Sequence, residues 1–318
     1  MKKSRVVLGA VFFVCLFSVT AQSAAALYER GIAAEGREDW YTATQYFIEA
    51  TTINPSYGDA WFHLAECAYH LEQYDVALSY LESAEKLQRN NTALYNLRGL
   101  SYIALGRTAD ARVVFTDVLS RAPNDVDARF GLAELDLLEG KMNSAEQLYR
   151  EALSRQATNR KALLSLALVS AALNQPEQAQ QYMNQALRYY SGDATVHYLA
   201  ACLASLSGDY VQAERQARVA VEVNGSYDQA YALLASVLYV QGKYREAEDI
   251  CDFRIGTNRL HGDAWYLKGL SLYRQGKIDG AITTWSAGLV VVPDDEVMRA
   301  ALELTVNESL PIEDARRP

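Results

Sequence analysis

Hydrophobic and small residues recur along this chain with a period of 34 residues. Windows of that length begin at Ala24, Gly58, Thr92, Val126, Arg160, Ala194, Asp228 and Gly262, and the last ends at Asp295. No window contains an insertion or a deletion. A fixed period of this size is the signature of a repeat architecture, in which each unit buries its apolar face against its neighbours.

Each window carries two helical stripes of apolar or small residues, numbered from the first residue of the window. The first stripe falls at positions 4, 7, 8 and 11, and the second at positions 17, 20, 24 and 27, which is the spacing of one helix face. Between them, position 15 holds a residue that tolerates the left-handed conformation after a helix end. It is Gly106, Gly140, Gly208, Gly242 or Gly276 in five windows and Asn174 in a sixth. The pattern predicts a helix, a turn and a second helix in every window.

Two positions are small in every window. Position 20 is always alanine, at Ala43, Ala77, Ala111, Ala145, Ala179, Ala213, Ala247 and Ala281. Position 8 is always glycine or alanine, at Gly31, Ala65, Gly99, Ala133, Ala167, Ala201, Ala235 and Gly269. Two helices approach closely only where side chains are short, so we expect the two positions to face each other within each hairpin. Arg254 and Cys251 depart from the apolar pattern in the seventh window.

The period, the register and the small positions resemble the tetratricopeptide repeat family over residues 24–295. The resemblance implies an all-α fold, a right-handed α-solenoid of eight helix-turn-helix repeats. Pentatricopeptide repeats have a similar length and bind RNA. The formal net charge of −9 argues against them, because an acidic chain repels phosphate backbones.

The two ends of the chain lie outside the repeats. Residues 1–23 begin with Lys2, Lys3 and Arg5 and continue in a short apolar run, the layout of a secretory signal peptide. An uncleaved N-terminal anchor is the alternative. At the other end, residues 296–308 are predicted to form a single capping helix with Val297, Ala300, Ala301 and Leu304 inward and a wet outer face. Residues 309–318 are predicted to be disordered.

Composition and cysteine usage narrow the class of protein. Half of the 318 residues are hydrophobic and 22% are charged, a balance typical of a folded chain. No transmembrane span is expected in the mature chain, and nucleic acid is not expected as a partner. After signal cleavage Cys67, Cys202 and Cys251 remain, too far apart in sequence to suggest a disulfide framework. We therefore expect an exported protein, periplasmic or associated with the cell envelope.

In the family that this chain resembles, positions 2, 5, 6, 9, 12 and 13 of the first helix line a concave groove, and these are called groove positions below. Several aromatic, acidic and histidine residues occupy them. Those predicted to bind a partner are Tyr28, Phe62, His63, Glu66, Tyr69, His70, Phe130, Glu134, Tyr198, Tyr239, Tyr266 and Tyr273. Aromatic side chains are rigid anchors at interfaces. The alternative is that each of them packs on the neighbouring repeat.

In the family that this chain resembles, one subgroup binds the C-terminal carboxylate of chaperones. It does so with lysine and asparagine side chains at groove positions 5 and 9. Only Asn96 matches here and no lysine occupies position 5, so this clamp is not expected. No cofactor-binding motif or catalytic constellation is present either, and the chain is predicted not to be an enzyme.

The stretch from His63 to His70 places His63, Glu66, Cys67 and His70 at helical spacing, which raises the question of a metal site. Two histidines seven residues apart lie about 10 Å apart along a helix axis, too far for one zinc ion with nitrogen ligands at about 2 Å. Only Glu66 with His70, or His63 with Cys67, could chelate within this helix. The sequence predicts no metal site.

These observations together predict a scaffold that holds a partner protein or peptide in an aromatic, acidic groove. The alternative is a small-molecule-binding accessory protein of a transporter, with the ligand inside the superhelix. The sequence does not decide the oligomeric state.

Overall fold

The computed structural model describes residues 23–88 and 91–309. Within these ranges the chain forms seventeen α-helices and no strand, so the predicted all-α repeat fold is confirmed. Residues 1–22 of the predicted signal peptide and residues 310–318 of the predicted tail lie outside the described residues. Ser23 caps the first helix, because its hydroxyl accepts a hydrogen bond from the Ala26 backbone N–H at 3.1 Å.

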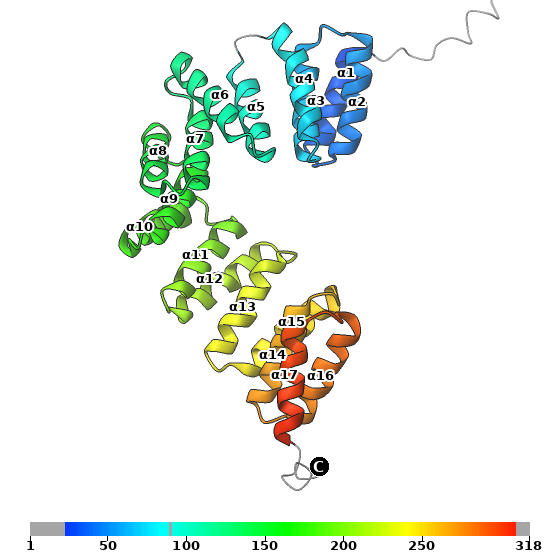
Figure 1. Ribbon diagram of the computed structural model, residues 1–318, viewed down its shortest axis with the longest axis vertical. Helices are drawn as coiled ribbons and strands as arrows, with labels where there is room; N and C mark the ends of the chain where they lie inside the picture. Colours follow the sequence, from blue (N-terminus) through cyan, green and yellow to red (C-terminus); the bar gives the residue numbers. More distant parts are fainter. Residues whose placement is uncertain (1–22, 89–90, 310–318) are drawn as a thin grey trace, which may run out of the picture. The chain divides into compact units, whose positions relative to one another are not determined.

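The helices begin where the sequence period places them (Figure 1). The first helices of the eight windows are α1 (Ala24–Glu35), α3 (Gly58–His70), α5 (Thr92–Ala104), α7 (Val126–Leu138), α9 (Arg160–Ala172), α11 (Ala194–Leu206), α13 (Asp228–Val240) and α15 (Gly262–Arg274). The second helices are α2 (Trp40–Ile53), α4 (Tyr74–Leu87), α6 (Thr108–Arg121), α8 (Met142–Arg155), α10 (Pro176–Tyr189), α12 (Tyr210–Val223), α14 (Tyr244–Thr257) and α16 (Ile278–Val291). A further helix, α17 (Glu296–Ser309), follows.

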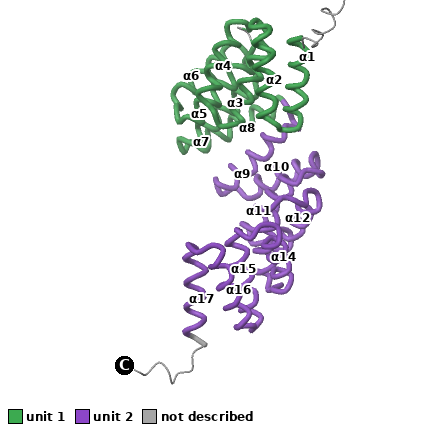
Figure 2. The backbone as a smooth tube through the Cα atoms, turned by 90° about the vertical axis from the view of Figure 1, so that its right-hand side faces the viewer, with its two compact units in different colours: residues 1–155 green, residues 156–318 purple. Residues whose placement is uncertain are grey.

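The chain divides into two compact units, residues 1–155 and residues 156–318 (Figure 2). Unit 1 contains α1 to α8, and unit 2 contains α9 to α17. Within each unit the two helices of a window pack on each other, and the second helix of one window packs on the first helix of the next. Each hairpin therefore buries its two apolar stripes partly against its own partner and partly against a neighbour.

A residue with a left-handed backbone closes the turn in all eight windows. The glycines at position 15 have φ between 72° and 80°, and Asn174 has φ of 56°. In the first two windows Glu38 (φ 58°) and Glu72 (φ 60°) adopt the same conformation, although both carry a Cβ atom. The turn geometry is thus common to the whole array, and the sequence signal for it is missing in two windows.

The small residues at positions 8 and 20 lie in the core, and the structure adds a third partner to them. Every alanine at position 20 is buried. Where position 8 is glycine, at Gly31, Gly99 and Gly269, a Cβ atom would stand closer than 3.0 Å to an aromatic ring. In each case this ring belongs to position 24 of the same window, at Phe47, Phe115 and Trp285. Glycine at position 8 makes room for a bulky ring at position 24.

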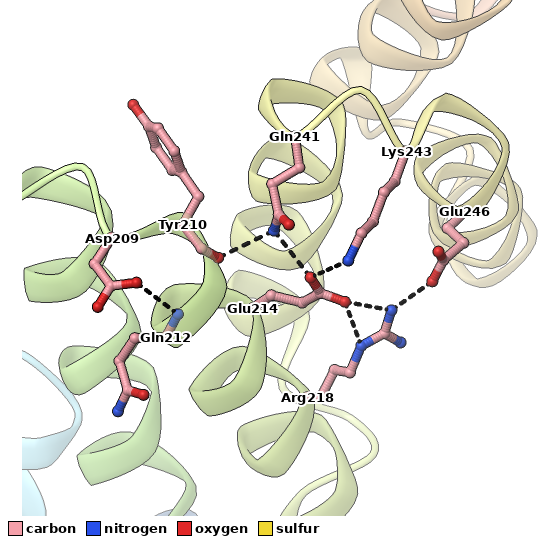
Figure 3. A network of polar contacts seen from close by, with 8 residues as sticks. All are labelled: Asp209, Tyr210, Gln212, Glu214, Arg218, Gln241, Lys243 and Glu246. Carbon is pink, nitrogen blue, oxygen red and sulfur yellow. Dashed lines mark hydrogen bonds and ion pairs between the residues drawn. The ribbon is translucent and has the colours of Figure 1, made fainter.

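An ionic cluster joins neighbouring windows in unit 2 (Figure 3). The Glu214 carboxylate on α12 accepts hydrogen bonds from Arg218 Nε at 3.0 Å, Gln241 Nε2 at 2.9 Å and Lys243 Nζ at 2.6 Å. Arg218 also pairs with Glu246 of α14. Burial alone would raise the pKa of Glu214, but Lys243 and Arg218 outweigh it and lower the pKa to about 2.

Part of this cluster recurs one period later. Glu248 occupies the place of Glu214 and accepts from Gln275 Nε2 at 3.0 Å, with Lys277 Nζ at 3.5 Å. The lysine and the glutamine come from the turn of the following window, so a carboxylate on one second helix holds the next turn in place. The contact joins repeats to one another, beyond the apolar packing.

Helix α17 continues the repeat register, and this corrects the prediction of its inward stripe. Met298 and Thr305 are buried, whereas Val297 and Leu304 are 59% and 64% exposed. The predicted inward stripe is therefore wrong by one residue, because Met298 fills the space beside Gly288 and Trp265. The helix also reaches Ser309, one residue beyond the predicted end.

Candidate functional site

The predicted groove residues come from first helices, and in unit 1 three of them meet around His63 of α3: Tyr28, Phe62 and Glu66. His63 Nδ1 lies 2.9 Å from Glu66 Oε2, one turn along the same helix, and 3.0 Å from Glu35 Oε2. Glu35 is the last residue of α1 and occupies groove position 12 of the preceding window. The structure thus adds Glu35, which the sequence analysis does not include, to the predicted groove residues His63 and Glu66.

Aromatic rings surround the His63 imidazole. The Phe47 ring stacks on it with centroids 5.4 Å apart, and the rings of Tyr28 and Phe62 meet it edge-on, each at 5.5 Å. Within this box Nδ1 lies next to both carboxylates. Burial by itself lowers the pKa of His63, but Glu35 and Glu66 outweigh it and raise the pKa to about 9. At neutral pH a protonated imidazole balances one of the two negative charges.

Cys67 lies next to this cluster and is buried. Its Sγ donates to Glu35 Oε1 at 3.4 Å, which leaves the other oxygen of that carboxylate for His63. Burial, together with the charge of Glu35, raises the pKa of the Cys67 thiol well above its ordinary value. The thiol therefore stays protonated and acts as a hydrogen-bond donor.

Tyr28, Tyr69 and His70 also contact residues of other helices. Tyr28 packs against Tyr57, the residue before α3, with ring centroids 4.9 Å apart. The His70 ring is exposed and stacks on Trp40 of α2 at 3.9 Å. Tyr69 is half-buried, and its pKa is raised by burial and by the nearby charge of Glu134.

Phe130 does not face solvent. Its side chain is only 3% exposed and packs against Tyr149 of the same window at 5.5 Å. The prediction that Phe130 contacts a partner is therefore corrected: the ring is part of the hairpin core. Its neighbour Gly131 lies against the Phe115 ring, where a Cβ atom would stand under 3.0 Å from three ring atoms, so α7 approaches α6 closely.

In unit 2, Tyr198 and Tyr239 are held by neighbouring aromatic residues. Tyr198 packs on Tyr227 at 5.2 Å, and burial raises the pKa of Tyr198 to about 12. Tyr239 lies against Tyr244 at 5.5 Å, and its hydroxyl accepts a hydrogen bond from Arg274 Nε at 3.2 Å. Both residues remain half-buried.

Tyr266 and Tyr273 line a cleft of about 560 Å³ between α15 and α17. Its apolar lining includes Leu270 on α15 and Val297, Ala300 and Leu304 on α17. On α15 these are groove positions 5, 9 and 12. On α17 they correspond to positions 2, 5 and 9 of a ninth window, so both helices present the same face of the repeat. These α17 residues are predicted from the sequence to point inward, and Leu270 is not among the predicted groove residues, because aliphatic side chains at groove positions carry no distinct sequence signal.

Comparison with known families decides what these repeats are. One model of the tetratricopeptide repeat matches residues 96–160 and 234–290, and a second matches residues 34–100 and 136–203. The matched segments together span most of the chain. The chain belongs to the tetratricopeptide repeat family.

Individual relatives of this tetratricopeptide repeat protein share part of its length. Serine/threonine-protein phosphatase T of Aspergillus oryzae is 29% identical over 121 residues, which is 38% of this chain and 25% of that protein. The chain thus spans a quarter of the length of this curated relative. A match confined to so small a part does not carry over a phosphatase activity.

Solved structures share the fold. Yeast Tom70 superposes with a TM-score of 0.63 at 15% identity, covering 91% of this chain and 65% of that one. PilW, a type IV pilus biogenesis factor, has a TM-score of 0.56 at 20% identity, covering 68% of this chain and 98% of that one. Tetratricopeptide repeats are in general scaffolds for protein–protein interaction without catalytic function. None of the helices in the described part of the chain is long and apolar enough to cross a membrane.

Proposed function

We propose that this tetratricopeptide repeat protein is an envelope scaffold that holds a partner protein or peptide at the groove positions of its first helices. The observation that carries the proposal is the cleft between α15 and α17. Tyrosine rings form one wall, and the largely exposed Val297 and Leu304 form the other. Apolar side chains that remain open to water beside aromatic anchors are typical of a binding surface.

The cleft favours an apolar anchor residue from a partner that also carries positive charge. Its volume of about 560 Å³ accommodates one or two large side chains. Glu296 lines its edge, and the chain as a whole has a formal net charge of −9. An acidic surface speeds the encounter with a basic partner and discourages an acidic one.

The cleft can be tested without disturbing the core. Leu304→Arg places a charge in the cleft at a side chain that is 64% exposed. Val290→Arg, on α16 at a side chain that is 81% exposed and outside the cleft, is the matched control. Proteins that co-purify with the wild-type chain from its native host should be lost with Leu304→Arg and retained with Val290→Arg. Identical partners for wild type and Leu304→Arg would contradict the proposal.

Two further measurements address location and the kind of ligand. Export rests on the pattern of residues 1–23, and intact mass of the chain from its native host should show the loss of about 21 residues after cleavage near Ala21. A small-molecule ligand predicts a thermal shift of the purified chain with a metabolite mixture and no retained protein partner. That outcome would replace the scaffold proposal with the accessory-protein alternative.

A further inference from the structure

Glu35, His63 and Glu66 bring one nitrogen and two carboxylate ligands together from two helices. The three candidate ligand atoms all lie within 4.8 Å of one another. An imidazole nitrogen with carboxylate oxygens suits zinc and other divalent transition metals. Among the described residues, no other set of histidine, cysteine and acidic side chains has this geometry.

The His63 Nδ1 atom is buried, and its N–H direction is not aligned with either carboxylate well enough for a hydrogen bond. The two carboxylate oxygens nevertheless lie only 2.9 and 3.0 Å from this atom. In a tetrahedral site with metal–ligand bonds of about 2.0–2.2 Å, neighbouring ligand atoms are separated by roughly 3.3 Å. The two Nδ1–oxygen distances are a few tenths of an ångström below that separation.

The side chains around these three residues hold them in this arrangement. Phe47 stacks on the His63 ring and restricts its rotation. The Cys67 thiol donates a hydrogen bond to Oε1 of Glu35, and Oε2 of the same carboxylate faces His63. Residues that orient ligands in this way typically strengthen metal binding by 10- to 100-fold.

We propose that Glu35, His63 and Glu66 form a binding site for one divalent transition metal ion, with zinc as the representative ion. Three protein ligands leave the fourth tetrahedral position for water or an outside ligand. The two carboxylates supply two negative charges, which match the charge of the ion. The site links the first window to the second, so the bound ion also fastens α1 to α3. This inference is independent of the proposed scaffold function, because metal binding is measured without any partner.

The test uses the mature chain purified without a histidine tag and stripped with a chelator. Isothermal titration with zinc chloride should show one ion per chain, and cobalt(II) should give visible absorption bands typical of tetrahedral coordination. Glu35→Gln and His63→Gln should each weaken zinc binding at least 100-fold, and Cys67→Ala, which removes the hydrogen bond to Glu35, about 10-fold. His70→Gln is the matched control, since His70 lies on the same helix and stacks on Trp40. It should bind zinc like wild type.

Three results would overturn the proposal. The first is the absence of stoichiometric zinc binding in the wild type. The second is zinc binding that survives both Glu35→Gln and His63→Gln, and the third is zinc binding that millimolar magnesium displaces. Either of the last two would indicate a general acidic surface. Circular dichroism and thermal melting establish that each variant is folded. Glu35→Gln retains the size of the side chain, so its effect on metal affinity stands even if His63→Gln loosens the aromatic box.

Discussion

The phenyl ring of Phe115 on α6 lies so close to Gly99 on α5 that a Cβ atom on Gly99 would stand under 3.0 Å from three ring atoms. The same ring leaves no room for a Cβ atom on Gly131, in the next window. Phe115 is fully buried, so its ring cannot move outward. Two glycines from consecutive repeats thus make the space that one aromatic side chain fills.

Gly99→Ala is expected to destabilise the protein although alanine is the better helix former. Helix propensity would favour alanine by about 1 kcal/mol, but the ring of Phe115 must shift, which costs about 1–3 kcal/mol and also disturbs α7. Urea denaturation should show a lower midpoint. Gly256→Ala is the control, because its Cβ would meet nothing within 4 Å. The control should raise the midpoint slightly. An unchanged or higher midpoint for Gly99→Ala would contradict the packing argument.

The ionic cluster around Glu214 makes stability depend on pH in a defined direction. The pKa of Glu214 is about 2 in the folded chain, below the ordinary value of 4.5. Its stabilisation is therefore fully present above about pH 4.5 and is lost as the pH falls toward 2. Glu214→Gln should cost about 1–2 kcal/mol at pH 7, and the difference from wild type in thermal melting should shrink between pH 4.5 and 2. Glu222→Gln, an exposed change on the same helix, should have little effect at any pH.

Arg254 departs from the usual alanine at position 27, and the structure explains how it is tolerated. The side chain is only 4% exposed, and Nε and Nη2 donate to the two oxygens of Asp228, each at 2.9 Å. Nη1 donates to Asp263 at 2.5 Å. The guanidinium thus joins α14 to α13 and α15, the first helices on either side.

Removing one acidic partner of Arg254 should lower the free energy of unfolding more than replacing Arg254 itself. Asp228→Ala leaves the buried guanidinium with Asp263 alone and should cost about 2–3 kcal/mol in thermal or urea unfolding. Arg254→Met keeps a long apolar side chain and leaves two carboxylates that water can reach, so it should cost about 1 kcal/mol or less. A larger loss from Arg254→Met than from Asp228→Ala would refute this account.

Phe130→Ala should lower stability without a specific effect on partner binding. The ring is buried against Tyr149, and truncation of a buried phenylalanine costs about 3–5 kcal/mol. Phe253→Ala, at a ring that is 46% exposed, is the comparison and should cost about 1 kcal/mol. Differential scanning fluorimetry measures both. Equal, small effects would mean that Phe130 belongs to the surface after all.

The sequence alone predicted the all-α repeat fold and the two helices of every window, because the 34-residue period repeats a local signal eight times. The sequence also contains a correlation between positions 8 and 24 that indicates a contact between them. Glycine at position 8 occurs in the windows whose position 24 is phenylalanine or tryptophan, and alanine occurs with leucine, methionine, cysteine, tyrosine or alanine. Reading the two positions together would have identified the ring that packs on Gly31, Gly99 and Gly269.

Contacts between windows were decided only by the tertiary structure. A helical wheel gives the direction of a side chain around its own axis, so it placed His63 and Glu66 on one face. It does not give the distance between two helices, and therefore did not bring Glu35 of α1 to His63 or bury Phe130. Helix packing also determines which face of α17 is exposed, because Met298 rather than Val297 lies beside Gly288. Periodicity determines the register within a helix, whereas the packing of neighbouring helices determines which side chains meet.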